Sequence, residues 1–326
     1  MNNQILYFPY ISIPESAWTT RSILYWDNVG AIVPHIYKER PNRLERYMRE
    51  LVQAELVQQV FPYNYIHGDR NFDDSFLRIT QQRNFNLDER RAAFRRGEQF
   101  QIHIQKVGER IMNELTQMGI ARKKINSWEW HYVETKTAKL FMMYLASVIG
   151  KSGGFTPATN SAANVDLSIQ QNGLSSYSQR MRGKFLKDLM PYPINPDPIK
   201  LKKFKEKNSA QLKHFRILLE QSVLNVSSIR QKSLRNQTYE LKKEEILHCK
   251  DEIAAKLGES RFGKITYGSL FGLAGAAVAF VADQRAMGLF SLGNAVYSAL
   301  QGYDRPELNR QYAYLALIES DLKLKV

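Results

Sequence analysis

The sequence predicts an α+β protein, with a mixed α/β domain at the N-terminus and a helical domain at the C-terminus. Three observations predict it. Short apolar runs surround an amphipathic segment near the N-terminus, every periodic segment after residue 198 is helical, and a proline-rich stretch separates the two regions. We place the mixed domain at residues 1–190, the connector at 191–198 and the helical domain at 199–326. A chain of 326 residues is long enough for one large domain or two ordinary ones.

The first residues predict a βαβ-like opening. Residues 4–13 are aromatic and β-branched, which is typical of a strand, and Pro9 favours a strand edge or a strand end. Ser16 is placed to cap a helix over residues 17–26, and residues 30–34 form a second short apolar run. Because a crossover helix joins the two strands, we expect them to be parallel.

The rest of the mixed domain alternates between helical and strand-like patterns. Helices are expected where apolar residues recur every three or four positions, and strands where they alternate or form aromatic runs. The expected helices cover residues 44–60, most of 87–119, and 137–149 up to Gly150; the expected strands cover 61–66 and 128–133. Residues 153–178, rich in Gly, Ser, Asn and Gln, predict a long surface loop.

The helical domain follows the connector, which four prolines stiffen. An apolar stripe that includes Leu201 and Phe204 predicts a helix over residues 199–224. Further helices are expected over residues 236–257 and 306–322. Pro306 suits the first turn of the last one, where its missing N–H has no helical partner in any case.

Residues 265–303 predict a tight antiparallel helical hairpin whose turn is Asp283 to Arg285. Small residues, including Gly268, Gly272 and Gly275, recur at spacings of three and four, so they share one helical face on which two backbones can approach closely. The first arm has about 18 largely apolar residues, short of the ~20 that a spanning helix needs, and the second arm is more polar. We therefore favour a hairpin buried in protein, with membrane insertion as the alternative.

Composition restricts the function classes. A single cysteine, Cys249, excludes an internal disulfide framework and a cysteine-rich zinc site, and it suits a reducing cytoplasm. The six histidines show no metal-ligand spacing, and no cofactor motif is present. The N-terminus lacks the pattern of a signal peptide, so a cytoplasmic protein is expected. The formal net charge of +14 suits an anionic partner such as nucleic acid, a membrane surface or an acidic protein.

Basic residues concentrate at the start of the helical domain. They are candidates for contacting phosphates or an acidic partner: Lys200, Lys202, Lys203, Lys205, Lys207, Lys213 and Arg216. No helix-turn-helix, zinc-finger or aromatic RNA-binding pattern accompanies them. A solvated helix surface remains the alternative interpretation.

No catalytic motif stands out. Gly150-Lys151-Ser152 is similar to the end of a phosphate-binding loop, but Leu145 occupies the position where that loop needs a glycine. The run also follows a helix, whereas a phosphate-binding loop follows a strand. The sequence therefore favours a non-catalytic protein, and an enzyme whose site is assembled from distant residues stays open.

Three landmarks in the expected order carry a resemblance. They are Leu6-Tyr7-Phe8-Pro9-Tyr10 with Trp18, Leu24-Tyr25-Trp26-Asp27 and Ile32-Val33-Pro34; then Tyr144-Leu145-Ala146 with Thr156-Pro157-Ala158-Thr159-Asn160; then Phe204-Lys205, Leu212, Phe215-Arg216 and Glu220. In this combination, which spans most of the chain, the protein resembles an uncharacterised bacterial family known only as a domain of unknown function. Relatives tend to have Thr-Asp where this chain has Thr159-Asn160, which weakens any carboxylate role there.

That family occurs near bacterial anti-phage genes, and this association implies the first functional hypothesis. We expect a non-catalytic component of a defence assembly that acts through protein contacts, with a partner encoded nearby or a second copy of the chain. A nucleic-acid-binding sensor that uses the lysine-rich helix is the second hypothesis. A membrane-perturbing effector that uses the hairpin at 265–303 is the third.

Overall fold

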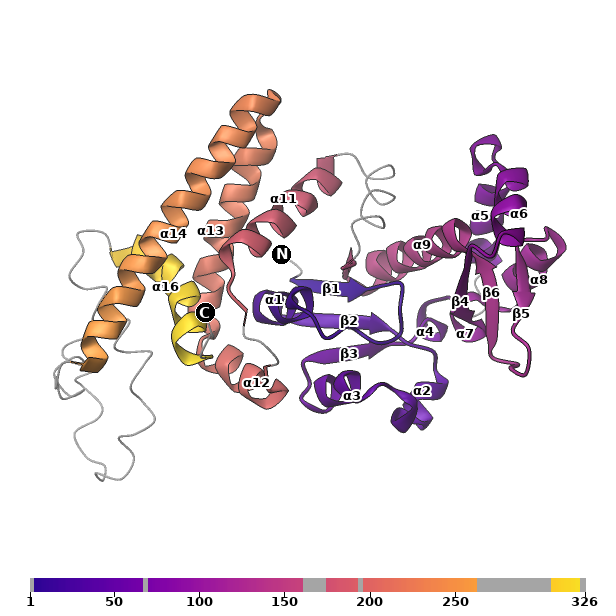
Figure 1. The fold of residues 1–326 in the computed structure, drawn as a ribbon, viewed down its shortest axis with the longest axis horizontal. Helices are drawn as coiled ribbons and strands as arrows, with labels where there is room; N and C mark the ends of the chain where they lie inside the picture. The colour runs from indigo at the N-terminus through magenta and orange to yellow at the C-terminus, as the bar shows by residue number, and fades with distance from the viewer. Residues whose placement is uncertain (1–2, 67–69, 161–173, 193–195, 263–305, 323–326) are drawn as a thin grey trace. The chain divides into compact units, whose positions relative to one another are not determined.

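The chain folds into two compact units, each of which draws on two separate segments. The computed structural model describes residues 3–66, 70–160, 174–192, 196–262 and 306–322. Residues 1–15 and 26–172 form the α/β unit, and residues 16–25 and 173–326 form the helical unit. The protein is therefore α+β, as predicted, with its sheets in the N-terminal part and helices in the C-terminal part (Figure 1).

A four-stranded parallel sheet forms one half of the α/β unit. Its strands are β1 (Gln4–Tyr7), β2 (Asn28–Ile32), β3 (Val57–Val60) and β7 (Thr156–Ala158). Their order across the sheet is β3-β2-β1-β7, and every neighbouring pair is parallel. The parallel pairing of the first two strands, expected from the short crossover, is thus confirmed.

The crossover helix between β1 and β2 packs in the helical unit. This helix, α1 (Ala17–Tyr25), lies between two strands of the α/β unit in sequence. Arg21 Nε donates to the Met190 carbonyl oxygen over 3.0 Å, and the Tyr314 hydroxyl donates to the Leu24 carbonyl oxygen over 2.6 Å. The units therefore divide at three points of the chain, and the division after residue 172 precedes the expected connector at 191–198.

A three-stranded antiparallel sheet forms the other half of the α/β unit. In it, β6 (Trp130–Glu134) pairs with β4 (Gln99–His103) on one side and with β5 (Ala121–Lys123) on the other. Helix α9 (Thr135–Gly153) follows β6 and contacts both sheets. Leu6, Ile102 and Phe141, from the two sheets and α9, belong to one continuous apolar core.

Short helices complete the α/β unit. They are α2 (Ile36–Glu39), α3 (Arg46–Gln53), α4 (Tyr63–Ile66), α5 (Arg70–Thr80), α6 (Leu87–Arg95), α7 (Ile104–Val107) and α8 (Glu109–Gln117), with single turns at Pro41–Arg43 and Arg83–Phe85.

Helix α9 starts and ends for identifiable reasons. The buried Glu134 carboxylate caps its N-terminus by accepting from the backbone N–H groups of Lys136 and Thr137 over 2.8 and 2.7 Å. Gly150 does not end the helix as predicted; it is needed because a Cβ there would lie 2.6 Å from the Phe155 carbonyl oxygen. The helix ends instead at Gly154, whose φ of 71° is the left-handed conformation that glycine adopts most easily.

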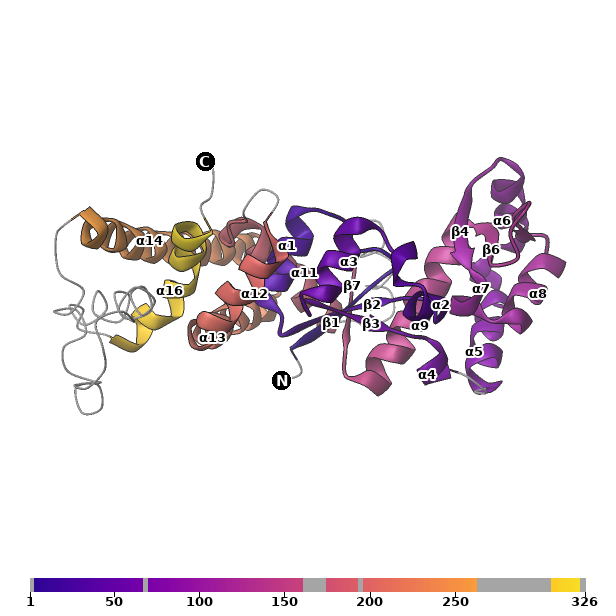
Figure 2. The ribbon, with the colours of Figure 1, turned by 90° about the horizontal axis from the view of Figure 1, so that it is seen from below.

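The helical unit is built from α11 (Leu174–Leu189), α12 (Pro198–Lys207), α13 (Ser209–Ser228), α14 (Lys232–Phe262) and α16 (Pro306–Asp321). Helix α16 packs against both α13 and α14, and α11 packs against α13 (Figures 1 and 2). The helices expected over 236–257 and 306–322 correspond to α14 and α16.

Two expected elements of the α/β unit are wrong. The helix expected over 44–60 ends at Gln53, because Glu55 takes a left-handed conformation (φ 57°) and residues 57–60 leave to pair with β2. The strand expected over 61–66 is the short helix α4, in which the Pro62 carbonyl oxygen accepts from the N–H groups of Tyr65 and Ile66.

Three further elements differ from expectation. Residues 87–119 were expected to be mainly helical, but they include the strand β4. Residues 153–178 were expected to form a loop, but they include the strand β7 and the start of helix α11. The helix expected over 199–224 is two helices that part at Asn208, whose buried side chain donates to the Phe204 carbonyl oxygen over 2.9 Å.

The predicted hairpin at 265–303, with Gly268, Gly272 and Gly275, lies outside the described residues. In the described part of the chain, the helices fall short of the length and apolar content that a membrane crossing requires.

Candidate functional site

A crevice of about 420 Å³ lies at the carboxyl end of β1. Strand β1 is flanked by β2, which follows it in sequence, and by β7, which the chain reaches far later. Ligands of open parallel sheets bind outside the carboxyl ends of the strands, where the strand order reverses in this way. The volume is in the range of ordinary small-molecule sites, about 300 to 1,000 Å³. We call this feature the β1 crevice.

Both halves of the α/β unit contribute to the β1 crevice. Residues 7–14 lead into it from β1, and Asn160 follows β7. Residues 37–45 approach from the region after β2, while residues 100–106 and Trp130 come from the antiparallel sheet and α7. The site therefore needs segments that are more than a hundred residues apart in sequence.

Lys106 is the buried cation of the β1 crevice. Its side chain is 2 % exposed, and its Nζ donates to the carbonyl oxygens of Pro9 and Tyr10 over 3.2 and 3.3 Å. Burial lowers the pKa of Lys106 to about 7, because the charged form loses its hydration. The two hydrogen bonds fix the chain just after β1, so Lys106 shapes the wall of the crevice.

His103 lies near Lys106, and it has a glutamate and an arginine, Glu129 and Arg43, as further charged neighbours. Arg43 binds the Glu129 carboxylate with both terminal nitrogens, over 3.0 and 2.6 Å, and these hydrogen bonds hold the pKa of Glu129 below its usual value. His103 is fully buried, and its Nδ1 accepts from the Gln105 backbone N–H over 3.2 Å. The remaining proton of the neutral ring is therefore on Nε2.

The Nε2 atom of His103 is buried without a hydrogen-bond partner among the described residues. The nearest carboxylate oxygen, Oε2 of Glu129, lies 4.0 Å away, which is too long for a hydrogen bond. Burial lowers the pKa of His103 to about 4, with Glu129 acting in the opposite direction. The imidazole is thus neutral at physiological pH, and its Nε2–H is a buried donor close to a carboxylate that Arg43 holds.

Aromatic rings make up much of the remaining lining. The rings of Tyr10 and Phe100 lie 5.5 Å apart between centroids. Trp130 meets the His103 ring edge-on at 5.2 Å, and Tyr37 meets it at 6.3 Å. Tyr10 is 49 % exposed, and it gives the β1 crevice an open aromatic side.

Tyr7 and Asn160 connect the ends of β1 and β7. The buried Tyr7 hydroxyl donates to Asn160 Oδ1 over 3.3 Å. Burial raises the pKa of Tyr7, so the side chain stays a phenol. Asn160, whose neutral amide made a carboxylate role doubtful in the sequence, therefore lines the crevice as a hydrogen-bonding group. Within the described ranges, no three His, Cys, Asp or Glu side chains gather as a metal site would require.

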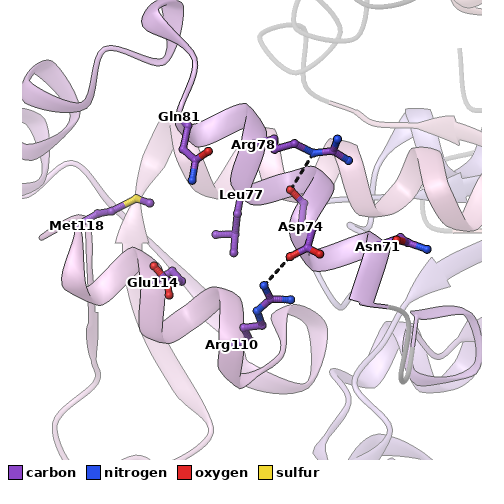
Figure 3. Close-up of a pocket in the computed structure, with 8 residues that line it drawn as sticks. All are labelled: Asn71, Asp74, Leu77, Arg78, Gln81, Arg110, Glu114 and Met118. Carbon is purple, nitrogen blue, oxygen red and sulfur yellow. Dashed lines mark hydrogen bonds and ion pairs between the residues drawn. The ribbon is translucent and has the colours of Figure 1, made fainter.

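A second cavity, which we call the α5–α8 groove, is larger than the β1 crevice and more open to solvent. It has a volume of about 590 Å³ and lies between α5 and α8. Figure 3 shows Arg110 reaching Asp74 from the facing helix, with an Nη2–Oδ1 distance of 2.5 Å. Both side chains are about half exposed, at 50 % and 51 %. No buried ionisable group among the described residues lines this groove, so the β1 crevice is the stronger candidate.

The lysine-rich segment forms α12 and the start of α13, and its members differ in exposure. Lys200, Lys203 and Lys213 are exposed, and Lys207, also exposed, lies 3.5 Å from Asp321. Two more members are half-buried: Lys202 and Lys205.

Arg216 is not part of the exposed basic surface. It is 6 % exposed, and both Nε, at 2.6 Å, and Nη2 donate to the Tyr25 carbonyl oxygen. Its position next to Phe215, a residue of the apolar stripe, is a core position. Arg216 is thereby corrected from a partner contact to an internal support of α1.

Sequence reasoning missed most of the β1 crevice. Lys106 and His103 lie in a stretch expected to be helical, and Glu129 lies within the strand expected over 128–133 without any distinguishing pattern. One signal was available: Pro9, which favours a strand edge or a strand end within the run 4–13, lies two residues after the observed end of β1 at Tyr7, and parallel sheets place their ligands at such ends. Comparison of the chain with protein-family models, with curated proteins and with solved structures gives no match.

Proposed function

We propose that the α/β unit binds a small organic molecule in the β1 crevice, and that the protein is a ligand-binding component rather than an enzyme. The observation that carries this proposal is the position of a 420 Å³ crevice at the carboxyl ends of β1 and β7. Lys106 and His103 are buried beneath its surface, so they fix its shape.

The lining favours a ligand with a flat ring and hydrogen-bonding groups, as in a nucleoside or nucleotide. Tyr10 and Phe100 offer ring faces or edges, and Trp130 lines the same space. Stacking of a base on an aromatic side chain contributes about 1 to 3 kcal/mol. Asn160 and Gln101 supply amide N–H donors, and their oxygens, which accept from Tyr7 and Lys124, each keep a second lone pair, which suits the edges of such a ring.

Calorimetric titration of the full chain with a panel of nucleosides and nucleotides tests this proposal. Tyr10→Ala removes a half-exposed ring of the crevice and is expected to weaken binding about tenfold or more. Arg110→Ala, in the α5–α8 groove, is the matched control and should leave the affinity unchanged. Binding that is lost only in Arg110→Ala would move the site to the groove, and no binding across the panel would overturn the ligand class.

A second candidate function rests on the exposed lysines of α12 and α13. Lys200, Lys203 and Lys213 point three positive charges at solvent, which suits a nucleic acid or an acidic protein. Their change to Glu should weaken binding to all nucleic-acid sequences alike, and affinity should fall steeply with salt. Tight binding that ignores both salt and these changes would contradict this candidate.

A role as a non-catalytic component of an anti-phage assembly is compatible with both proposals. In such an assembly, the helical unit would contact the partner protein and the α/β unit would bind the ligand. Copurification with the products of neighbouring genes tests this role, because a partner retained by the parent and lost on changing Lys200 and Lys203 to Glu would identify the contact surface. Purification of the chain alone as a monomer would argue against it.

A further inference from the structure

The hairpin between β5 and β6 ends in two large apolar side chains that face solvent. Ile125 is 78 % exposed and Trp128 is 63 % exposed. These are the largest exposed fractions among the big apolar side chains of the described residues. Single exposed apolar residues are ordinary, but here two lie within four positions on one turn. We call residues 122–128 the hairpin tip; Figure 1 shows the loop beyond the ends of β5 and β6.

The hairpin tip has a defined conformation. The Ser127 N–H donates to the Lys124 carbonyl oxygen over 3.2 Å, which closes a four-residue turn. Asn126 takes the left-handed conformation, with φ of 60°. The Trp130 N–H donates to Ser127 Oγ over 3.3 Å, so both sides of the turn are tied. Ile125 occupies the second position of this turn and is held outward rather than folded onto the sheet.

Three consecutive cations precede the apolar pair. Arg122, Lys123 and Lys124 form no ion pair with a described residue. Arg122 and Lys124 donate to the amide oxygens of Gln99 and Gln101, over 3.2 and 3.1 Å, and those acceptors carry no charge. The nearest carboxylate in sequence, Glu129, is buried and held by Arg43. The positive charge of the tip is therefore not neutralised.

We propose that the hairpin tip docks on an anionic phospholipid surface. An exposed isoleucine suits entry into the acyl boundary, a tryptophan suits the headgroup level, and neighbouring cations suit lipid phosphates. A nucleic-acid strand fits less well, because Ile125 offers neither a ring face nor a hydrogen-bonding group. The contact is peripheral and involves residues apart from both the β1 crevice and the predicted hairpin at 265–303.

Flotation of the full-length protein with vesicles tests the proposal. Vesicles of phosphatidylcholine alone are compared with vesicles that also contain phosphatidylglycerol. The parent protein should float with the anionic vesicles and much less with the neutral ones. The variant Ile125→Asn with Trp128→Asn keeps the net charge and should lower the partition about tenfold or more. Its melting curve, compared with the parent curve, reports whether the fold is retained.

Charge variants complete the test. Changing Lys123 and Lys124 to Glu should abolish flotation, whereas the same change at the exposed Lys200 and Lys203 of α12 alters net charge equally and should leave most of it. Flotation that survives the Ile125/Trp128 change would place lipid contact elsewhere and overturn the proposal. Absence of flotation, or tighter binding to a single-stranded oligonucleotide that the same change abolishes, would also overturn it.

Discussion

Each unit of the protein buries a cation on backbone carbonyl oxygens, and the two cations have different surroundings. Arg216 of the helical unit donates to the Tyr25 carbonyl oxygen at the end of α1, in a filled core where the Tyr25 and Phe215 rings meet edge-on at 6.2 Å. Lys106 of the α/β unit donates to the carbonyl oxygens of Pro9 and Tyr10, just after β1, and lines a cavity. The same chemistry thus supports a packed helix in one unit and an open crevice in the other.

The difference also concerns charge. A guanidinium keeps its charge inside a protein, whereas a buried amine can lose its proton. In the helical unit, Arg182 binds Glu220 with Nε and Nη2 over 2.5 and 2.7 Å, and Tyr25 donates its hydroxyl to the same carboxylate over 2.7 Å. Charge in that core is compensated. Beside the crevice, burial lowers the pKa of Lys106 to about 7, so its charge depends on conditions near neutrality.

Of the substitutions compared at neutral pH, the one with the largest expected effect on stability lies in the packed core of the helical unit. Arg216→Met removes two charge-assisted hydrogen bonds and leaves the Tyr25 carbonyl oxygen buried without them, so we expect a loss of about 2 to 4 kcal/mol in unfolding free energy. Thermal and urea unfolding of the full chain measure it. Lys213→Met, on the exposed face of the same helix, is the control, with an expected change within about 0.5 kcal/mol. Equal effects of the two variants would show that Arg216 does not anchor α1.

The crevice side should instead respond to pH. The folded-state pKa of Lys106, about 7, is below the ordinary value of 10.5, so between these values the unfolded chain binds more protons than the folded one. Stability contributed by this group therefore rises with pH through that window, by at most about 1.4 kcal/mol per pH unit. Lys106→Met should lack this rise, while Lys203→Met should keep it. Unfolding free energies measured for the parent and both variants at several pH values from about 7 to about 10 show whether Lys106 causes the rise.

The sequence predicts the surroundings of Arg216 better than those of Lys106. The apolar stripe that includes Leu201, Phe204 and Phe215 correctly predicts the buried faces of α12 and α13, because helical periodicity is a local property. It could not show that Arg216, next to Phe215, faces inward, since the acceptor is the carbonyl of Tyr25, 191 positions away.

The lining of the β1 crevice could not be predicted from a local sequence pattern, because it too depends on residues far apart in the chain. The βαβ opening was predictable from residues 4–34, although the expected first strand, 4–13, runs past the observed end of β1 at Tyr7. The opposite wall depends on β4 and α7, where Gln99–Val107 carries too few apolar repeats to distinguish a short strand from a helix. Tertiary pairing with β6 decides that conformation, and only the pairing brings His103 and Lys106 to the crevice.

A smaller effect is expected from His103 on the acid side. Burial lowers its folded-state pKa to about 4, below the ordinary 6.5, so the unfolded chain binds the proton more readily between these values. Stability is fully present above 6.5 and is lost as pH falls toward 4, by about 1 kcal/mol per pH unit in mid-window. His103→Gln should flatten this loss, and His248→Gln, an exposed control on α14, should not. A parent-like acid slope in His103→Gln would mean that another group causes it.

The smallest expected effect is the coupling energy of an ion pair beside each cavity. Comparing the two coupling energies distinguishes a solvent-exposed site from a buried one. Arg110 and Asp74 at the α5–α8 groove are each about half exposed, at 50 % and 51 %, so water screens their attraction and a coupling energy of about 0.2 to 1 kcal/mol is expected. At the β1 crevice the Glu129 side chain is 9 % exposed and is held by two hydrogen bonds from Arg43, so its coupling should be larger and should resist salt.

Two double-mutant cycles with alanine, Arg110 with Asp74 and Arg43 with Glu129, measure both couplings in low and high salt. The groove coupling should shrink toward zero as salt rises, because a screened surface pair has little else to hold it. The crevice coupling should persist, because Glu129 is removed from the counterions that would replace Arg43. Equal couplings with equal salt dependence would mean that the crevice is as open to solvent as the groove. In that case the buried character that distinguishes the β1 crevice as the ligand site would be lost.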